Sequence, residues 1–193
     1  MTEPIHIMEP SALLQGDFSS RQLRDALGMF ATGVTVVTTV DAAGVPVGLT
    51  INSFSAVSLE PPLILWSLVN TAGSRDAFLN SKGFVVNVLA AHQHDLAMQF
   101  ASRSPDRFLN VPITRGTGGL PLLSGALAWF ECKRYAEHLA GDHTIFIGQV
   151  QRVGHQQAAA SAAQNGTDHD RDLTLTTPLL FHRGILHRHG FNH

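Results

Sequence analysis

Residues 48–67 carry side chains suited to binding a flat, heteroatom-rich ligand. Hydroxyl and amide side chains, among them Thr50, Asn52 and Ser53, stand between two apolar runs typical of strands. Such groups, together with backbone N–H and C=O groups, can bind the polar edge of a planar ring while apolar residues contact its faces. The same residues also fit an ordinary strand, a Ser-rich turn and a second strand, so both interpretations stay open.

A second set of polar donors lies within residues 70–75. It offers an amide, hydroxyls and a guanidinium, from Asn70, Thr71, Ser74 and Arg75. A predicted helix begins in this segment, and a helix N-terminus favours an anion. The segment therefore predicts a phosphate site, with Lys82 as a weaker second candidate. The alternative is an ordinary helix cap at Ser74 beside a solvated Arg75.

The elements that must position these side chains are mostly short strands. Strands are predicted over residues 34–40, 45–50, 63–69, 84–89, 126–137 and 144–153. Helices are predicted from Ser19 or Ser20 to Gly33, over 71–80 and over 94–101, with a loop over 102–119. Many short strands, sparse helices and no βαβ alternation favour an antiparallel barrel over a Rossmann sheet. No Gly-x-Gly-x-x-Gly fingerprint is present.

Composition agrees with one compact domain that has a partner subunit. The chain has 193 residues, 44% hydrophobic and 15% charged, and a net charge of −2. This balance suits a globular domain, here residues 18–193, with some surface covered in a homodimer. The absence of a Lys/Arg-rich run argues against nucleic-acid binding.

Cys132 is the only cysteine, so no intramolecular disulfide can form. A reducing compartment, most simply the cytoplasm, is therefore predicted. Residues 1–17 read as a flexible N-terminal arm, since they lack a signal-peptide pattern, and no window has the length of a membrane span. The Ala-rich segment 156–172 predicts a mobile loop.

Three segments in order, residues 25–39, 48–62 and 138–150, resemble the flavin reductase family. These are small NAD(P)H:flavin oxidoreductases that supply reduced flavin to two-component monooxygenases. The similarity runs from Phe18 to Val153 and resumes from Pro178 to His187, so it covers most of the chain.

The resemblance implies a fold and a reaction. The fold is mainly β with peripheral helices, an FMN-binding split β-barrel of Greek-key type that pairs as a homodimer with flavin at the interface. The reaction is hydride transfer from NADH or NADPH to FMN or FAD, and reduced flavin diffuses to a partner monooxygenase. The flavin carries the electronics of such a step, so no general base is required.

The resemblance also carries over site residues by position. It places a group of residues against the ring and ribityl chain of the flavin, namely Thr32, Gly33, Val34, Thr50, Asn52, Ser53, Phe54 and Ser55. His143, in the sequence Gly141-Asp142-His143, is implied to be the catalytic residue, which contacts the nicotinamide of NAD(P)H or gates access to the flavin. From the residues alone, Phe54 also fits a plain core position and this turn also fits a capped hairpin.

The C-terminal histidines His182, His187, His189 and His193 match no compact metal pattern, so no metal site is predicted. The family has an aromatic residue at the position of Leu186, and His187 is a candidate replacement for it. Two alternatives to a flavin reductase stay open. One is a non-catalytic flavin carrier or sensor, and the other is a different split-barrel oxidoreductase, such as a relative of pyridoxamine-phosphate oxidase.

Overall fold

The computed structural model describes residue 16, residues 18–156 and residues 176–188. The predicted arm over 1–17 and the predicted loop over 156–172 fall outside these ranges, apart from Gly16 and Gln156. The helices are α1 (Ser20–Leu27), α2 (Arg75–Asn80), α3 (His94–Ala101) and the 3-10 helices η2 (Ala91–Gln93) and η3 (Thr117–Gly119). None of the helices in the described part is long and apolar enough to cross a membrane.

Strands dominate the described residues, which confirms the prediction of a mainly β protein with few helices. The first six are β1 (Thr32–Gly33), β2 (Thr35–Val40), β3 (Pro46–Ile51), β4 (Ser55–Leu59), β5 (Pro62–Val69) and β6 (Gly83–Val88). The others are β7 (Ile113–Arg115), β8 (Pro121–Leu123), β9 (Ala128–Ala140), β10 (His143–His155), β11 (Leu180–His182) and β12 (Ile185–His187).

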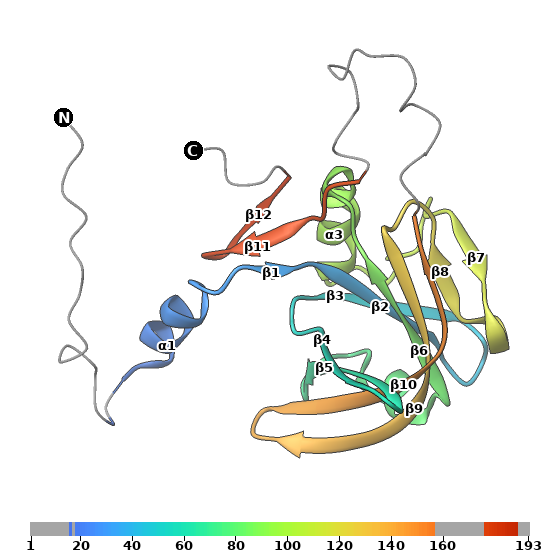
Figure 1. Ribbon diagram of the computed structural model, residues 1–193, viewed down its shortest axis with the longest axis horizontal. Helices are drawn as coiled ribbons and strands as arrows, with labels where there is room; N and C mark the ends of the chain where they lie inside the picture. The colour runs from blue at the N-terminus through green and yellow to red at the C-terminus, as the bar shows by residue number, and fades with distance from the viewer. Residues whose placement is uncertain (1–15, 17, 157–175, 189–193) are drawn as a thin grey trace, which may run out of the picture.

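Seven strands form one antiparallel sheet in the order β3-β2-β6-β9-β10-β5-β4. It curls around the core, with the long β9–β10 hairpin across its lower side (Figure 1). Its two edge strands, β3 and β4, follow each other in the chain, joined by residues 52–54. No ladder joins these edges in the described chain, so the sheet is open there. Two small sheets, β1-β11-β12 and β7-β8, flank it.

Strand β2, next to the edge strand β3, is buried along almost its whole length, because its Thr and Val side chains favour the pleated, packed surface of a sheet. Two of its three buried hydroxyls have partners: Thr38 Oγ1 donates to the carbonyl of Pro121, and Thr39 Oγ1 donates to the carbonyl of Gly83 at 2.8 Å, whereas Thr35 Oγ1 has none. The buried Asn87 on the neighbouring strand donates to Val36 O at 2.9 Å and accepts from Leu123 N at 2.8 Å. These bonds remove most of the cost of burying polar groups.

The main core is aromatic and sits inside the curl of the sheet. Trp66 stacks on Phe146 with ring centroids 4.7 Å apart and meets Phe78 edge-on at 4.9 Å. Gly148 on β10 lies where an added Cβ would come within 2.5 Å of Phe84 Cζ. Only glycine therefore lets β10 approach this ring, and Phe78 holds α2 against the same cluster.

Helix α1 begins as predicted but ends earlier. Ser19 forms a capping box with Gln22, while Gly28 is the C-cap, so the predicted end at Gly33 is wrong. Thr32 and Gly33 instead pair with β11, and this sheet partner outcompetes helix continuation. No residue of α1 is buried, and the helix stands away from the main sheet (Figure 1).

Three further boundaries differ from the sequence prediction. The helix predicted over 71–80 is only Arg75–Asn80, because residues 70–74 are turns. The loop predicted over 102–119 contains β7 and η3. The hairpin turn predicted over 139–142 is the two residues Gly141 and Asp142, which makes β9 and β10 longer than expected.

Candidate functional site

The predicted phosphate segment lies beside the predicted nicotinamide turn. Asn70 N donates to the carbonyl of Asp142 at 2.8 Å, and Asn70 Nδ2 donates to the carbonyl of Gly141 at 3.3 Å. Thr144 Oγ1 donates to Asn70 Oδ1 at 2.7 Å. The pairing of β5 with β10 sets this contact, because Val69 stands opposite His143. The amide of Asn70 thus clamps the turn.

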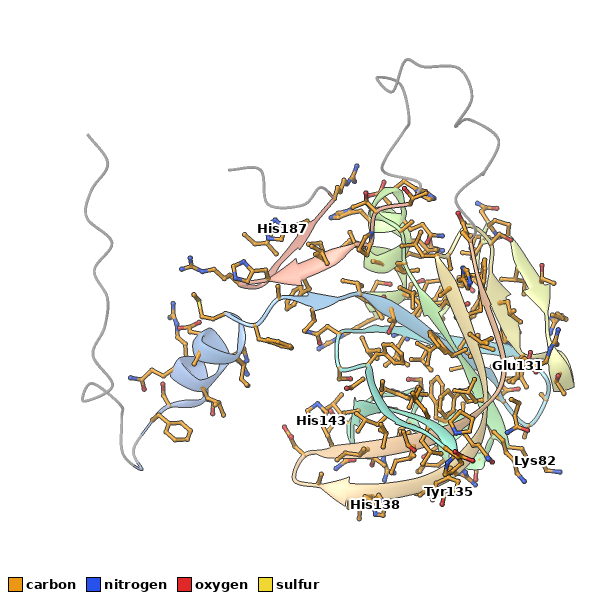
Figure 2. The ribbon with its side chains drawn as sticks, viewed as in Figure 1. Lys82, Glu131, Tyr135, His138, His143 and His187 are labelled. Carbon is orange, nitrogen blue, oxygen red and sulfur yellow. The ribbon has the colours of Figure 1, made fainter. Side chains whose placement is uncertain are left out.

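The turn itself fixes His143 at the start of β10. Gly141 has φ 62°, a conformation that favours glycine. His143 Nδ1 donates to Asp142 Oδ1 at 2.7 Å, and this hydrogen bond, with the His143 charge, lowers the pKa of the Asp142 carboxyl. The His143 side chain is 44% exposed, and it lies at the free end of the β9–β10 hairpin (Figure 2). The ionised Asp142 carboxylate therefore orients the His143 imidazole, which remains accessible to a ligand.

Ser74 and Arg75 both keep polar groups available for a ligand. Ser74 stands at the N-cap position of α2, but its side chain makes no capping hydrogen bond. Arg75 is half-buried, and its Nε is buried without a hydrogen-bond partner. The alternative of a Ser74 side-chain cap beside a fully solvated Arg75 is therefore wrong. Because α2 has only six residues, its dipole adds little to anion binding.

Lys82 is separated from the rest of the predicted set. It lines a cavity of about 710 Å³ together with Glu131 and Cys132, which no other predicted site residue reaches. Figure 2 shows Lys82 and Glu131 on the side of the molecule away from His143. Lys82 therefore lies apart from His143, and the cavity beside Lys82 is not the predicted site.

Residues 32–34 differ in their burial and in their hydrogen bonds. Thr32 Oγ1 is buried without a hydrogen-bond partner, and an added Cβ on the exposed Gly33 would meet no atom within 4 Å. Val34 is 1% exposed; its N–H donates to Leu179 O at 3.0 Å and its carbonyl accepts from Leu89 N at 3.0 Å. Gly33 is therefore open to a ligand, the Thr32 hydroxyl is buried and unpaired beside it, and Val34 belongs to the core.

Residues 50–55 divide between structural and open positions. Thr50 Oγ1 donates to the carbonyl of Ala97 at 2.6 Å, which holds α3 on β3. Ser53 Oγ accepts from Ser67 N at 3.0 Å and donates to Ser67 O at 3.2 Å, so it ties the 52–54 connection to β5. Phe54 is half-buried against Phe130, with centroids 5.5 Å apart.

The remaining polar side chains of this region stay at the surface. Asn52, Ser55 and Thr71 are exposed. Together with the unpartnered Thr32 hydroxyl and Arg75 Nε, they offer amide and hydroxyl groups for a polar ring edge and a cation for a phosphate. This donor set fits the chemistry of a flavin nucleotide.

The structure adds a residue that the sequence prediction missed. Arg107, from the loop after α3, faces Gly73 and Ser74 across a cavity of about 270 Å³. Nothing in its local sequence ties it to the 70–75 segment, since the approach depends on how the loop folds back over β3.

The C-terminal histidines give no metal site in the described residues. No group of three or more His, Cys, Asp or Glu side chains is arranged there to hold a metal ion. His182 and His187 lie with ring centroids 6.1 Å apart on β11 and β12, while His189 and His193 fall outside the described residues. Leu186 packs against the core, and His187 sits on β12 away from His143 (Figure 2).

Known proteins match this chain over most of its length. The family described as "Flavin reductase like domain" matches residues 27–189. "FMN reductase (NADH) SmoA" of Agrobacterium fabrum is 42% identical over 156 residues, which cover 81% of this chain and 88% of that protein. A "Probable flavin reductase" of Rhizobium meliloti is 47% identical, but the match covers 69% of this chain and only 43% of that longer protein.

Solved structures agree with these matches. "NADH:FAD oxidoreductase SgcE6" of Streptomyces globisporus has a TM-score of 0.75 and 33% sequence identity, covering 97% of this chain and 99% of that one. A second structure of SgcE6, described as in complex with NAD and FAD fragments, has a TM-score of 0.74. With the matched sequence, the shared fold and the donors described above, this chain belongs to the flavin reductase-like family.

Proposed function

We propose that this protein is a flavin reductase that transfers a hydride from NAD(P)H to FMN or FAD. The observation that carries the proposal is the clamp by Asn70, which holds the Gly141-Asp142-His143 turn against the phosphate segment. Both substrates of a hydride transfer have to be held close together, and this clamp joins the two regions proposed to bind them. The names of SmoA and SgcE6 support the same reaction.

In this mechanism, the residues of this chain bind the flavin and orient the nicotinamide. The flavin, when bound, supplies the hydride-accepting ring. Ser74 and Arg75 hold its phosphate through a hydroxyl and a guanidinium, while Thr32, Asn52 and Ser55 bind its polar edge. His143, fixed by Asp142, orients the nicotinamide. No side chain has to move a proton for the hydride step, so positioning is the main contribution of the protein.

The finer fold is part of the proposal. The sheet is the split barrel of the family, and the split lies between the edge strands β3 and β4, which the short 52–54 connection joins. Residues 18–193 act as a single domain, in support of which β1 from the N-terminal half pairs with β11 from the C-terminal end.

A homodimer is proposed from the apolar side chains near α1. Leu27, Met29 and Phe30 are 64%, 60% and 77% exposed in the single chain. Apolar surface of this size is usually covered by a partner. We propose a second copy of this chain as the partner that covers this surface, because the proposed flavin site includes Thr32 and Gly33 of β1, which follows α1 in the chain.

The proposed physiological partner is a flavin-dependent monooxygenase in the cytoplasm, supplied by diffusing reduced flavin. The relative "Flavin-dependent monooxygenase, reductase subunit HsaB" of Rhodococcus jostii supports it; it is 39% identical, over 85% of this chain and 75% of that protein.

One assay tests the reaction. NADH and NADPH oxidation is followed under steady-state conditions with and without FMN, FAD and riboflavin. We expect oxidation of at least one nucleotide that depends on added or bound flavin. A folded protein that binds flavin without oxidising either nucleotide would instead be a carrier or sensor. Oxygen-dependent turnover of pyridoxamine phosphate would indicate the other split-barrel activity.

A further inference from the structure

We propose that the cavity of about 710 Å³ beside Lys82 and Lys133, here named the lysine cavity, binds a small organic carboxylate. This ligand is neither the flavin nor the NAD(P)H of the proposed reaction. Figure 2 shows Lys82 on the side of the molecule away from His143. The volume is in the range of sites that bind small organic molecules.

The lysine cavity lies against four neighbouring strands of the large sheet. β2, β6, β9 and β10 are consecutive in that sheet, and they contribute Val40, Gly83, Lys133 and Gln151 to the lining. Gly83 pairs with Lys133 across β6 and β9. Lys82 directly precedes Gly83, so this pairing brings the two lysines to one cavity.

The positive charge of the lysine cavity comes from these two residues. Lys82 and Lys133 are the only lysines in the chain, and both line this cavity. Both are exposed, and neither forms an ion pair with a carboxylate of the described residues. Two ammonium groups without carboxylate partners at one cavity favour an anionic ligand.

The two acidic residues of the lining are held by other parts of the fold. Glu131 is buried; its Oε1 accepts from Thr117 N at 3.2 Å, and its Oε2 pairs with Arg152 Nη1 at 3.3 Å. Asp41 Oδ1 accepts from two backbone N–H groups of its own turn, both at 2.9 Å. These bonds leave the two lysines as the charged groups available to a ligand, which favours an anion over a cation.

Apolar atoms make up most of the surface that lines the lysine cavity. Val40, Ala42 and Leu120 contribute to it, and an added Cβ on Gly118 would meet no atom within 4 Å. An organic anion with an apolar body matches this lining better than an inorganic anion, because its body removes apolar surface from water. The Cys132 side chain packs in the aromatic core, so the lysine cavity is assigned binding and no chemistry.

The first test measures binding to the full-length protein by isothermal titration calorimetry. The probes are benzoate, naphthoate and octanoate, with the neutral naphthamide as the control ligand. We expect at least one carboxylate to bind, and naphthamide to bind more weakly than naphthoate. Lys82→Gln and Lys133→Gln should each weaken carboxylate binding roughly three- to tenfold, because each removes one positive charge. Arg103→Gln removes an exposed charge outside the cavity and should match the wild type.

A second pair of variants tests the location without changing charge. Ala42→Trp places a large side chain at the lysine cavity and should prevent carboxylate binding. Ala43→Trp is the matched control, because Ala43 is exposed on the same turn but does not line the cavity.

Amine acylation reads the lysine cavity directly, because the chain has no other lysine. Bound carboxylate should slow the acylation of Lys82 and Lys133, measured by peptide mass spectrometry, with the N-terminal amine as internal reference. No binding by any of the three carboxylates, equal binding of naphthamide and naphthoate, or binding that the lysine and Ala42 variants leave unchanged would overturn the proposal. FMN that displaces the carboxylate or protects the lysines would also overturn it, since Lys82 would then belong to the flavin site.

Discussion

The backbone N–H of Asn70 donates a 2.8 Å hydrogen bond to the carbonyl of Asp142. The two residues are far apart in the sequence, yet this bond joins the loop after β5 to the turn between β9 and β10. The side chain of Asn70 extends the link to Gly141 and Thr144. Asn70 is therefore a positioning residue for His143 in our interpretation, and not simply one more phosphate ligand.

Replacing Asn70 by Ala tests this role. The change removes two side-chain hydrogen bonds, which contribute about 0.5–1.5 kcal/mol each. We expect a higher KM for NAD(P)H or slower hydride transfer with little change in FMN affinity, measured by steady-state kinetics and flavin titration. Thr144→Val, which removes one of the same bonds, should shift the same constants. A selective loss of FMN over riboflavin binding would instead make Asn70 a phosphate ligand.

His143→Ala removes the imidazole proposed to orient the nicotinamide. Reduction of bound flavin, followed anaerobically by stopped flow, should slow or need more NAD(P)H, while flavin affinity stays nearly constant. The matched control is His138→Ala, since His138 is exposed on the adjoining strand β9 and lies on the same hairpin (Figure 2). Unchanged reduction in the His143 variant would return this residue to a structural role in the turn.

Arg75→Ala removes a guanidinium proposed to bind the flavin phosphate. A hydrogen bond to a charged group contributes about 1.5–3 kcal/mol, so FMN affinity should fall roughly ten- to a hundredfold. Riboflavin has no phosphate and should be much less affected. Arg115→Ala, an exposed arginine whose Nη1 donates to Gly119 O, is the control. Equal losses for FMN and riboflavin would contradict the phosphate assignment.

Cys132 should be unreactive in the folded protein. Burial, with a smaller effect from the Glu131 charge, raises the pKa of its thiol from 9.0 to about 12. The thiolate is therefore nearly absent from neutral to mildly alkaline pH, and an aromatic disulfide reagent should react only after unfolding in urea. Because the folded pKa is raised, its contribution to stability is complete below pH 9.0 and declines as pH rises toward 12. Rapid labelling of the native protein would contradict this environment.

Gly148→Ala should destabilise the protein by overpacking the aromatic core. The new Cβ would lie 2.5 Å from Phe84 Cζ and 2.9 Å from Cys132 Cβ, and such overpacking typically costs about 1–3 kcal/mol. Urea denaturation measures the loss. Gly154→Ala on the same strand is the control, because its nearest contact, Trp129 Cε3, is 3.6 Å away. Similar stabilities for both variants would show that the ring moves aside without cost.

Local chemistry in the sequence determined much of this protein. Ser19 begins α1 as predicted, since a capping box is a short-range interaction. The β-branched and apolar runs gave the strands around Val36 and Trp66, because such residues favour packed, pleated surfaces. The ordered polar segments indicated the family, which the matches over residues 27–189 confirm.

The tertiary structure decided which polar side chains form structural hydrogen bonds and which are exposed to a ligand. Thr50 and Ser53 look like Asn52 and Ser55 in the sequence, but the first two bond to Ala97 and Ser67 while the others are exposed. Strand pairing sets these differences, because it brings distant backbone groups within hydrogen-bond reach. The same long-range contacts place Lys82 and Ser74 on different cavities and bring Arg107 to Ser74, which no local pattern specifies.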